Sequence, residues 1–353
     1  MQEVNCYDEW TRLEEVWIAS VDGANHTIDP SFKAFFKKTV VGTEHGRQVT
    51  FDEAMLKLRA KELDNLEAVL TSLGVTVRRQ QPLNFLTPFS TPYWKAYSRP
   101  CDNPRDQILV LGDTIVETPH VVRDRYFEND VWKLWLYRYY NSGCRWISAP
   151  KPMMLTSSYD SVHNLEPYSH EENSPLQGPG LEIMFDAAQI LKLGQDVIMN
   201  VKDKNSALGF EWMQREFPEY KWHAVNFGPD ADHLDGELTI IRPGLLLVGH
   251  NVIEDKSVLP DFMQSWDTIE MADVAEHQKG LRLASEGIHV NALMVDENNI
   301  IINEDAVKTI DALEAKGITC HAVPLHNSTV FGGGIHCSTL DIRRAGGFEN
   351  YLT

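Results

Sequence analysis

Short apolar stretches recur along the chain in one order: two strands around a turn, then an amphipathic helix, then a further strand. The clearest pair is Ile108–Leu111 and Thr114–Glu117, which flank the turn Gly112-Asp113. A segment rich in Trp and Tyr follows over about residues 129–141, and Trp146-Ile147-Ser148 closes the unit. Short apolar runs bounded by turn residues are typical of β-hairpins, so this segment predicts a hairpin, a helix and a third strand.

The same order of elements returns elsewhere in the chain. The other copies are 188–193 and 196–200 with a helix at 206–217 and a strand at 222–227; 238–241 and 245–248; 292–295 and 300–303 with a helix at 304–316 ended by Gly317; and a less regular unit of 13–19, a helix at 51–73 and 75–78. Such units bury their apolar faces only against neighbours, so we expect a ring-like α/β fold. A two-domain doubly wound fold stays open, because hairpin and crossover signals are easily confused.

Composition narrows the class of partner. The chain has 353 residues and a formal net charge of −19, which opposes binding to nucleic acid or to anionic lipid. Neither a membrane-length apolar run nor a signal peptide is recognisable, so we expect a cytoplasmic protein acting on small molecules. Segment 156–180, rich in Ser, Pro, Gly and His, is the best candidate for a long functional loop.

The most distinctive segment is Gly332-Gly333-Gly334-Ile335-His336-Cys337. Consecutive glycines let the backbone come close to a ligand, next to a thiol that could act as a nucleophile. An inert cysteine beside a flexible loop is the alternative. The five cysteines are scattered and never in CxxC spacing, which argues against disulfides or a cysteine-rich zinc site. They are Cys6, Cys101, Cys144, Cys320 and Cys337.

Polar residues stand where several of the predicted hairpins begin. Asp106 precedes the first, Asp186 opens the next, and His233 and Asp235 open a third. On a strand, His233 and Asp235 would face the same way. A cysteine nucleophile needs an imidazole and a carboxylate that orients it, so Cys337, His233 and one of these acids would form a reactive site.

Two alternatives remain open for these residues. The acids could cap turns or pair with arginines, with His233 as an ordinary strand-end histidine. Asp232, His233, His336 and Cys337 could instead bind a metal, although their spacing matches no recognised zinc motif. His336 would point away from Cys337 in an extended segment, so we expect it to support the site and not to act as its base.

Taken together, these segments resemble the amidinotransferase family, which includes arginine:glycine, inosamine-phosphate and toxin-pathway enzymes. The resemblance runs in family order over nearly the whole chain. The matching segments are 103–106 (NPRD), 149–152 (APKP), 185–188 (FDAA), 208–212 (LGFEW), 233–235 (HLD), 332–337 (GGGIHC) and 341–344 (DIRR). The resemblance implies a five-bladed, pseudosymmetric α/β propeller formed by one domain over residues 1–353, a homodimer, and no metal or organic cofactor.

The resemblance also implies roles for individual residues. Cys337 would attack the guanidinium carbon of a donor such as arginine, and His233 would protonate the departing amine and later deprotonate the acceptor amine. Asp186 would orient His233. Asp106 and Asp235 would hold the guanidinium through charge-assisted hydrogen bonds.

The chain departs from the family where a substrate carboxylate is bound. The arginine found in arginine:glycine enzymes has no counterpart in 248–254, and Ala284-Ser285 stands where those enzymes have two serines. Ser285, Arg242 and His336 are the remaining candidate substrate-binding residues, and Gln189 replaces the second aspartate of the FDAA segment's family motif. We expect an enzyme of specialised-metabolite biosynthesis. The alternatives are an arginine deiminase-like hydrolase and a catalytically inactive arginine-binding protein.

Overall fold

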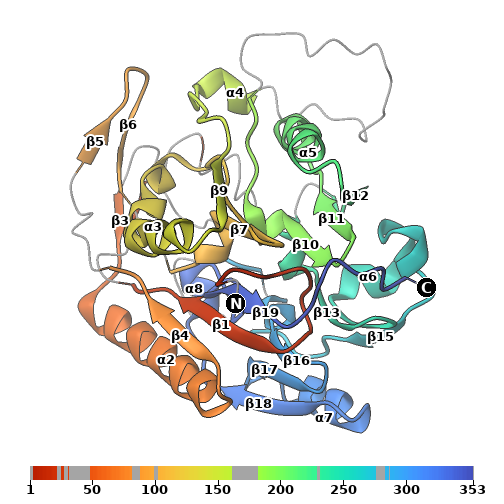
Figure 1. Ribbon diagram of the computed structural model, residues 1–353. Coiled ribbons are helices and arrows are strands. Elements are labelled where there is room, and N and C mark those ends of the chain that lie inside the picture. The colour runs from red at the N-terminus through yellow and green to blue at the C-terminus, as the bar shows by residue number, and fades with distance from the viewer. Residues whose placement is uncertain are drawn as a thin grey trace.

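The computed structural model describes a mixed α/β fold built mainly from small sheets (Figure 1). The residues it describes are 3–21, 25–27, 31, 48–81, 88–98, 102–160, 182–228, 231–275, 283–285 and 287–352. Within these ranges no sheet closes on itself. Of the 156–180 segment predicted as a loop, 156–160 form helix α4 and the remainder lies outside the described residues.

Five three-stranded sheets repeat one pattern in the described part of the chain. In each, the middle strand is antiparallel to one neighbour and parallel to the other. The sheets are β7 (Ile108–Leu111), β8 (Thr114–Glu117) and β9 (Arg145–Ser148); β10 (Ile190–Leu193), β11 (Asp196–Asn200) and β12 (Lys221–Val225); β13 (Leu238–Arg242), β14 (Leu245–Val248) and β15 (Asp267–Glu270); β16 (Leu293–Asp296), β17 (Asn299–Asn303) and β18 (Thr319–Val323); β19 (Thr339–Arg344), β1 (Leu13–Ile18) and β4 (Thr76–Arg79). The hairpins read from the sequence are therefore confirmed.

The fifth sheet joins the two ends of the chain. Strand β1 pairs antiparallel with β19, so that Ile18 lies opposite Thr339, and Figure 1 shows the red and blue strands side by side. Strands β1 and β4 were predicted from the sequence, but their partner β19 was not. Because Cys337 comes two residues before β19, this pairing fixes the candidate nucleophile against the N-terminal strand.

Helices connect the strands and cover them. They are α2 (Glu53–Ser72), α3 (Lys133–Asn141), α4 (Thr156–Asp160), α5 (Lys204–Glu216), α6 (His250–Glu254), α7 (Val307–Ala315) and α8 (Ser328–Phe331); two-stranded sheets β2 (Asn25–Thr27) with β3 (Gln48–Thr50) and β5 (Pro88–Ser90) with β6 (Lys95–Tyr97) complete the regular structure. Asp52 caps the N-terminus of α2, where its carboxylate accepts from the Met55 N–H at 2.7 Å, and Gly74 lies just beyond the C-terminal cap with φ +80°. None of the described helices has the length and apolar character needed to cross a membrane.

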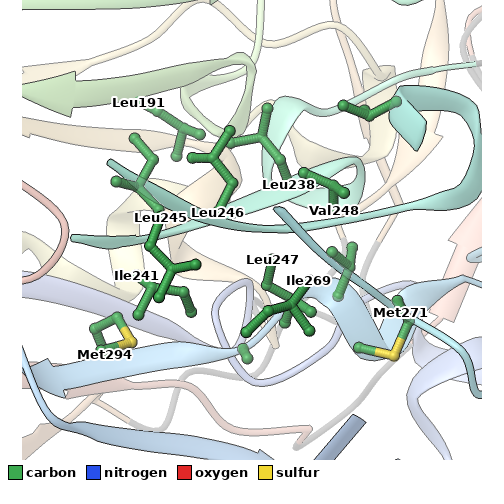
Figure 2. Close-up of a cluster of buried hydrophobic side chains, with 14 of the residues drawn as sticks. Leu191, Leu238, Ile241, Leu245, Leu246, Leu247, Val248, Ile269, Met271 and Met294 are labelled. Atoms are coloured by element: carbon green, nitrogen blue, oxygen red, sulfur yellow. The ribbon is translucent and has the colours of Figure 1, made fainter. Parts of the chain in front are cut away.

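Buried clusters link each sheet to at least two others. One cluster combines β7 and β8 with β10, β11 and α5, and the largest combines β10–β11 with β13–β15 and β16–β17. Figure 2 shows the centre of the largest cluster, where β13 and β14 contribute consecutive apolar residues. The remaining clusters join β16–β18 to β1 and α2, and β1 and β19 to β7 and β8. Strands buried on both faces explain the unbroken apolar runs in the sequence.

Four of the sheets are entered through a short 3₁₀ turn. These turns are η1 (Pro104–Asp106) before β7, η4 (Ala187–Gln189) before β10, η5 (Leu234–Gly236) before β13 and η8 (Ile288–Val290) before β16. Contacts link η1 with η4, η4 with η5, and η5 with η8. Residues 335–338 form the corresponding turn before β19. The polar residues singled out in the sequence therefore sit on turns that lie next to one another.

Candidate active site

The segment that carries Cys337 is held in a tight space where side chains would not fit. Gly332 ends α8 with φ +75°, a conformation that favours glycine. A Cβ atom on Gly333 would lie 2.0 Å from Oδ1 of Asn103, far inside contact distance. The glycines therefore allow the backbone to approach η1, and they place the thiol at the centre of the turns instead of on a mobile surface loop.

Asn291 fixes the thiol, although the sequence analysis did not select it. Its Oδ1 accepts from the Cys337 N–H at 2.9 Å, and its Nδ2 lies 3.2 Å from Sγ of Cys337. The same Nδ2 donates to the carbonyl of Asp235 at 3.0 Å. Asn291 directly follows η8. The other site residues also lie on or beside the 3₁₀ turn of their repeat, and this shared position was the sequence signal that could have identified Asn291.

His336 does not point away from Cys337. Instead of the extended segment predicted from the sequence, residues 335–338 form a turn in which the Ser338 N–H donates to the Gly334 carbonyl at 3.1 Å. As a result, Nδ1 of His336 lies 2.8 Å from Oδ2 of Asp235, and Sγ of Cys337 lies 3.4 Å from that same oxygen. The expectation of opposite faces was therefore wrong, while the supporting position of His336 agrees with this geometry.

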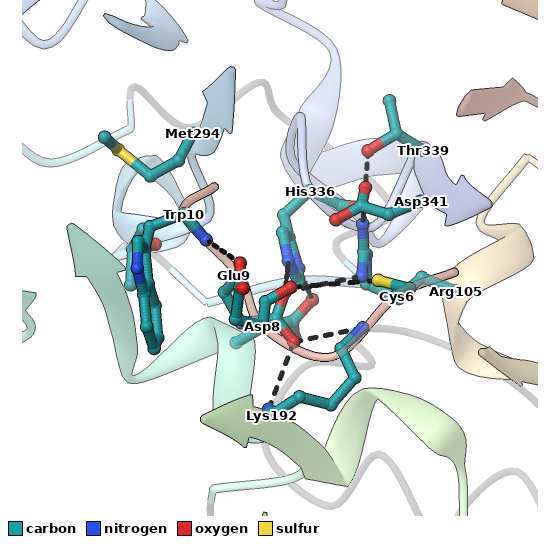
Figure 3. A network of polar contacts seen from close by, with 12 residues as sticks. Cys6, Asp8, Glu9, Trp10, Arg105, Lys192, Met294, His336, Thr339 and Asp341 are labelled. Carbon is teal, nitrogen blue, oxygen red and sulfur yellow. Dashed lines mark hydrogen bonds and ion pairs between the residues drawn. The ribbon is translucent and has the colours of Figure 1, made fainter. Parts of the chain in front are cut away.

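Behind His336 lies a buried ionic network, shown in Figure 3. The Nε2 atom of His336 is 3.3 Å from Glu9, and Glu9 in turn pairs with Lys192 at 3.2 Å. Arg105 donates to the His336 carbonyl at 2.8 Å and to Asp341 at 2.7 Å. Burial alone would raise the pKa of Glu9, but Lys192 and His336 outweigh it and hold that pKa below its usual range. These charges brace the turn that carries the thiol.

His233 and Asp186 form the second half of the site. His233 stands at the N-terminal boundary of η5, not on a strand as the sequence analysis supposed, and its Nε2 lies 3.0 Å from Oδ2 of Asp186. The other carboxylate oxygen of Asp186 accepts from Nε2 of Gln107 at 3.0 Å. Asp186 is fully buried and His233 is largely so. A carboxylate bonded to an imidazole in this way can hold the ring in one orientation, as nucleophilic chemistry at a cysteine would need.

Asp106 lies on the other side of the imidazole. Its Oδ2 pairs with Arg125 at 2.7 Å, and its Oδ1 lies 3.7 Å from Nδ1 of His233. One atom each from Asp106, His233 and Cys337 falls within 4.8 Å of the others. Among the described residues, the buried Oδ1 atoms of Asp106 and Asp235 have no hydrogen-bond partner. Two buried carboxylates with one unsatisfied oxygen each are suited to a cationic N–H donor.

Burial and the carboxylates set the protonation of these groups. Burial raises the pKa of the Cys337 thiol well above its usual value, and Asp235 and Asp106 raise it further. Burial lowers the pKa of His233, but Asp106 and Asp186 outweigh it and raise that pKa to about 9. Burial raises the pKa of Asp106 to about 6 despite Arg125. At neutral pH the site therefore holds a neutral Cys337 thiol, a His233 imidazolium and ionised Asp106 and Asp235.

A pocket of about 70 Å³ opens beside these groups. His233, Asp235, Ser285 and Cys337 are among the residues that line it. Asp106, Asp186 and His336 are not part of this lining, but each contacts a residue that is: Asp106 and Asp186 contact His233, and His336 contacts Asp235. Arg242 is not brought to the pocket, because it ends β13 and its Nη1 donates to the Glu297 carbonyl at 3.1 Å.

The same residues offer donors for a metal. The carboxylate of Asp106, the imidazole of His233 and the thiol of Cys337 are oxygen, nitrogen and sulfur donors of the kind that zinc accepts. This set differs from the one considered in the sequence, since Asp232 instead pairs with Lys202.

Comparison with known proteins gives one consistent result. No protein-family model matches the chain. The chain is 31% identical to an L-arginine:L-lysine amidinotransferase of Pseudomonas savastanoi pv. phaseolicola, over 98% of this chain and 96% of the relative. Among solved structures, inosamine-phosphate amidinotransferase from Streptomyces griseus matches with a TM-score of 0.88 and 32% identity over 100% of both chains. SxtG, an amidinotransferase from Microseira wollei in the saxitoxin biosynthetic pathway, matches with a TM-score of 0.83 and 33% identity over 99% of each chain.

Proposed function

This chain belongs to the amidinotransferase family, and from that premise we propose that it transfers the amidino group of arginine to a primary amine through a covalent adduct on Cys337. The observation that carries the proposal is the convergence of the thiol, the imidazole of His233 and the carboxylate of Asp106 within 4.8 Å. Mere binding of arginine needs no thiol at that point. The geometry therefore favours an enzyme that forms a bond to the guanidinium carbon.

The donor guanidinium binds between two carboxylates. Asp106 and Asp235 each have a buried Oδ1 without a hydrogen-bond partner in the described structure, and each carboxylate has an oxygen within 4.8 Å of Sγ of Cys337. A guanidinium presents five N–H donors in one plane, so it can satisfy both oxygens at once. Its positive charge also offsets the two carboxylates that hold the thiol neutral, which lowers the pKa of Cys337 when the donor arrives.

The first half-reaction then forms the adduct. The Cys337 thiol loses its proton to its hydrogen-bond acceptor Asp235, 3.4 Å away, and onward to solvent, while Sγ attacks the guanidinium carbon. His233, protonated at neutral pH, donates its proton to the departing amine as the C–N bond breaks. The products are the free amine, an amidino group bonded to sulfur, and a neutral imidazole held by Asp186.

The second half-reaction reverses these roles. The acceptor amine attacks the amidino carbon and gives a proton to the neutral imidazole of His233. The C–S bond breaks, and Cys337 regains a proton from Asp235 or solvent. Protons balance over the cycle, because His233 starts and ends as an imidazolium. The hydrogen bond of 3.0 Å to Asp186 supports this role by keeping the ring in one orientation.

We further propose a role in specialised-metabolite biosynthesis. Two similar enzymes act on inosamine phosphate or belong to the saxitoxin pathway, and another is named for arginine and lysine. The acceptor proposed for this chain is an amine of that range.

For the fold, we propose that the five sheets are the blades of one propeller and that residues 1–353 form a single domain. The shared clusters support this arrangement, because each sheet shares a buried cluster with at least two others and the fifth sheet joins the chain ends. One residue from each repeat then reaches the centre. The homodimer stays a prediction, which sedimentation velocity would test.

The test of the transfer reaction uses arginine labelled in the guanidino group. The protein is incubated with it, alone and with lysine, glycine and an aminocyclitol phosphate, and ornithine, citrulline and labelled guanidino products are followed. Transfer predicts ornithine and a labelled guanidino product only when an acceptor is present. Citrulline formed at the same rate without any amine would establish hydrolysis instead.

Two variants, each lacking one cysteine, test the covalent step. Intact-protein mass spectrometry after incubation with arginine alone should show one added amidino group in the wild type, and none in Cys337→Ala. The control Cys320→Ala removes a half-buried cysteine from β18 and should keep both the adduct and the turnover. An adduct in Cys337→Ala would remove Cys337 from the role of nucleophile.

A further inference from the structure

We propose that Gln107 and His120 are positioning residues of the transfer reaction, which act on His233 through Asp186. The inference rests on the proposed function. Nε2 of Gln107 donates to Oδ1 of Asp186 at 3.0 Å, and Oδ2 of Asp186 accepts from His233 at 3.0 Å. Oε1 of Gln107 is hydrogen-bonded to Nδ1 of His120. Neither Gln107 nor His120 was singled out by the sequence.

Only one assignment of donors and acceptors satisfies this chain of hydrogen bonds. An ionised carboxylate accepts and never donates, so the amide nitrogen of Gln107 must face Asp186 and the amide oxygen must face His120. That oxygen requires a donor, so Nδ1 of His120 carries a proton. His120 therefore donates to Gln107, and Gln107 donates to Oδ1 of Asp186. The other carboxylate oxygen of Asp186 accepts from His233.

The backbone of Gln107 is fixed as firmly as its side chain. It follows η1, and its carbonyl accepts from the Thr118 N–H at 3.1 Å and from the Thr118 hydroxyl at 3.0 Å. Gln107 is completely buried. Its neighbour Asp106 belongs to the proposed guanidinium site, so one short turn places both the donor-binding carboxylate and the amide that holds Asp186.

Gln107 and His120 orient the carboxylate of Asp186 without adding a charge beside it. Burial lowers the pKa of His120 to about 3, so its imidazole stays neutral wherever the enzyme works. A charged group at this place would change the proton affinity of His233 through Asp186. A neutral amide and a neutral imidazole hold the carboxylate without doing so.

His120 also has access to space on its far side. It lines a second pocket, of about 240 Å³, together with Glu117, Tyr126, Lys133 and Lys151. Removal of its ring would therefore leave a gap that is continuous with a pocket large enough for a small molecule. Free imidazole is the natural probe, since it restores the donor that Gln107 requires.

The first experiment compares Gln107→Leu with the wild type. Outer groups that orient reactive residues typically change activity by about 10- to 100-fold, so we expect kcat to fall by that factor. KM for arginine should stay within about threefold, because Gln107 does not face the guanidinium. The control His223→Ala removes a histidine that bonds to Asp196 at 2.7 Å, on the outer strand β12, and should keep kcat. An unchanged kcat in folded Gln107→Leu overturns the inference.

The charge variant Gln107→Glu provides a readout that a structural role would not move. Once ionised, the new carboxylate keeps an acceptor for His120 and brings a second negative charge to Asp186; because two carboxylates this close share a proton at lower pH, the comparison is made on the basic limb. The charged and titratable groups that face His233 are Asp186 from η4, Asp106 from η1, Asp235 from η5 and Cys337 before β19. Another anion beside Asp186 favours the imidazolium, so the basic limb of the kcat profile should move to higher pH. An unmoved limb contradicts the inference.

Chemical rescue tests His120 separately. In His120→Ala, kcat should fall, and millimolar imidazole should restore at least part of it. The same imidazole should not restore Gln107→Leu, which lacks the amide. Two results would contradict the proposed role of His120. One is a lower kcat in folded His120→Ala that imidazole does not restore, and the other is equal restoration of kcat in both variants.

Failure of the two proposals can be told apart. If the wild type transfers no amidino group, the proposed function fails. The pKa of His233, followed by NMR of ¹⁵N-labelled histidine, still reports whether Gln107→Glu raises it as the inference requires. If the wild type is active and that pKa does not move, only the inference on Gln107 and His120 is overturned.

Discussion

Replacement of Asn291 by aspartate removes the amide N–H donor that faces Sγ of Cys337 and, with it, the hydrogen bond from Nδ2 to the Asp235 carbonyl. In the wild type, Nδ2 of Asn291 lies 3.2 Å from Sγ of Cys337, and Oδ1 accepts from the Cys337 N–H. Asn291→Asp keeps the shape and the bond to the N–H. It exchanges the donor that faces sulfur for a carboxylate oxygen, so the contact with a thiolate changes from attraction to repulsion.

The size of the effect follows from that distance. Two like charges 3.2 Å apart interact by roughly 5 kcal/mol at the effective dielectric constant of about 20 that suits protein sites. The new carboxyl could avoid this repulsion by keeping its proton, but holding a group of pKa near 3.9 protonated at pH 8 costs about the same. If relaxation removes half of this energy, the thiol pKa still rises by about two units, since one unit corresponds to about 1.4 kcal/mol.

The assay is alkylation of Cys337 by iodoacetamide at pH 8, followed by peptide mass spectrometry. Because the thiolate is the reacting species, we expect alkylation to be about 100-fold slower in Asn291→Asp. The value of kcat/KM for arginine should fall at least as far. The control Asn298→Asp adds the same charge in an exposed turn and should change neither rate. Alkylation and turnover within threefold of the wild type, in folded Asn291→Asp, would refute the role assigned to this amide.

Three further predictions concern the same site. The pH profile of kcat/KM should be bell-shaped. Activity should be lost below about pH 6, where Asp106 gains a proton, and above about pH 9, where His233 loses one. A profile that is flat from pH 5 to 10 would contradict this assignment. Gly333→Ala would place a Cβ atom 2.0 Å from Asn103, so urea unfolding should show a loss of about 1–3 kcal/mol together with a lower kcat, and unaltered values would show that the loop can shift. Arg242→Ala should leave KM for arginine within about twofold, and a large rise in KM would place that arginine at the substrate after all.

Much of the secondary structure could be predicted because it depends on local pattern. The hairpin 108–117 was read from two apolar runs around Gly112, which has φ +60° in the turn. Helix α7 was expected to end at Gly317, and that residue has φ +79° directly after the helix boundary. Pairing between strands that are distant in the sequence has no local sequence pattern, so β19 was not recognised as the partner of β1.

The candidate site was predictable only in part for the same reason. Cys337, His233 and the three aspartates carry reactive or charged groups, so their residue types drew attention to them. The hydrogen-bonded network of the site also includes Asn291, Gln107 and Glu9. Amide and carboxylate residues are common in any sequence, so these three cannot be recognised as site residues until the fold shows which partners they contact.

The sequence by itself determined the repeating elements, the family resemblance and the reactive groups that could do guanidino chemistry. Tertiary structure decided how those groups meet. Five turns from separate repeats converge, so that the thiol, imidazole and carboxylates lie within a few ångströms, and burial there raises the pKa of Cys337 and, together with neighbouring charges, sets those of His233 and Asp106. Distance and burial are properties of the packed chain, because both depend on residues that are remote in sequence.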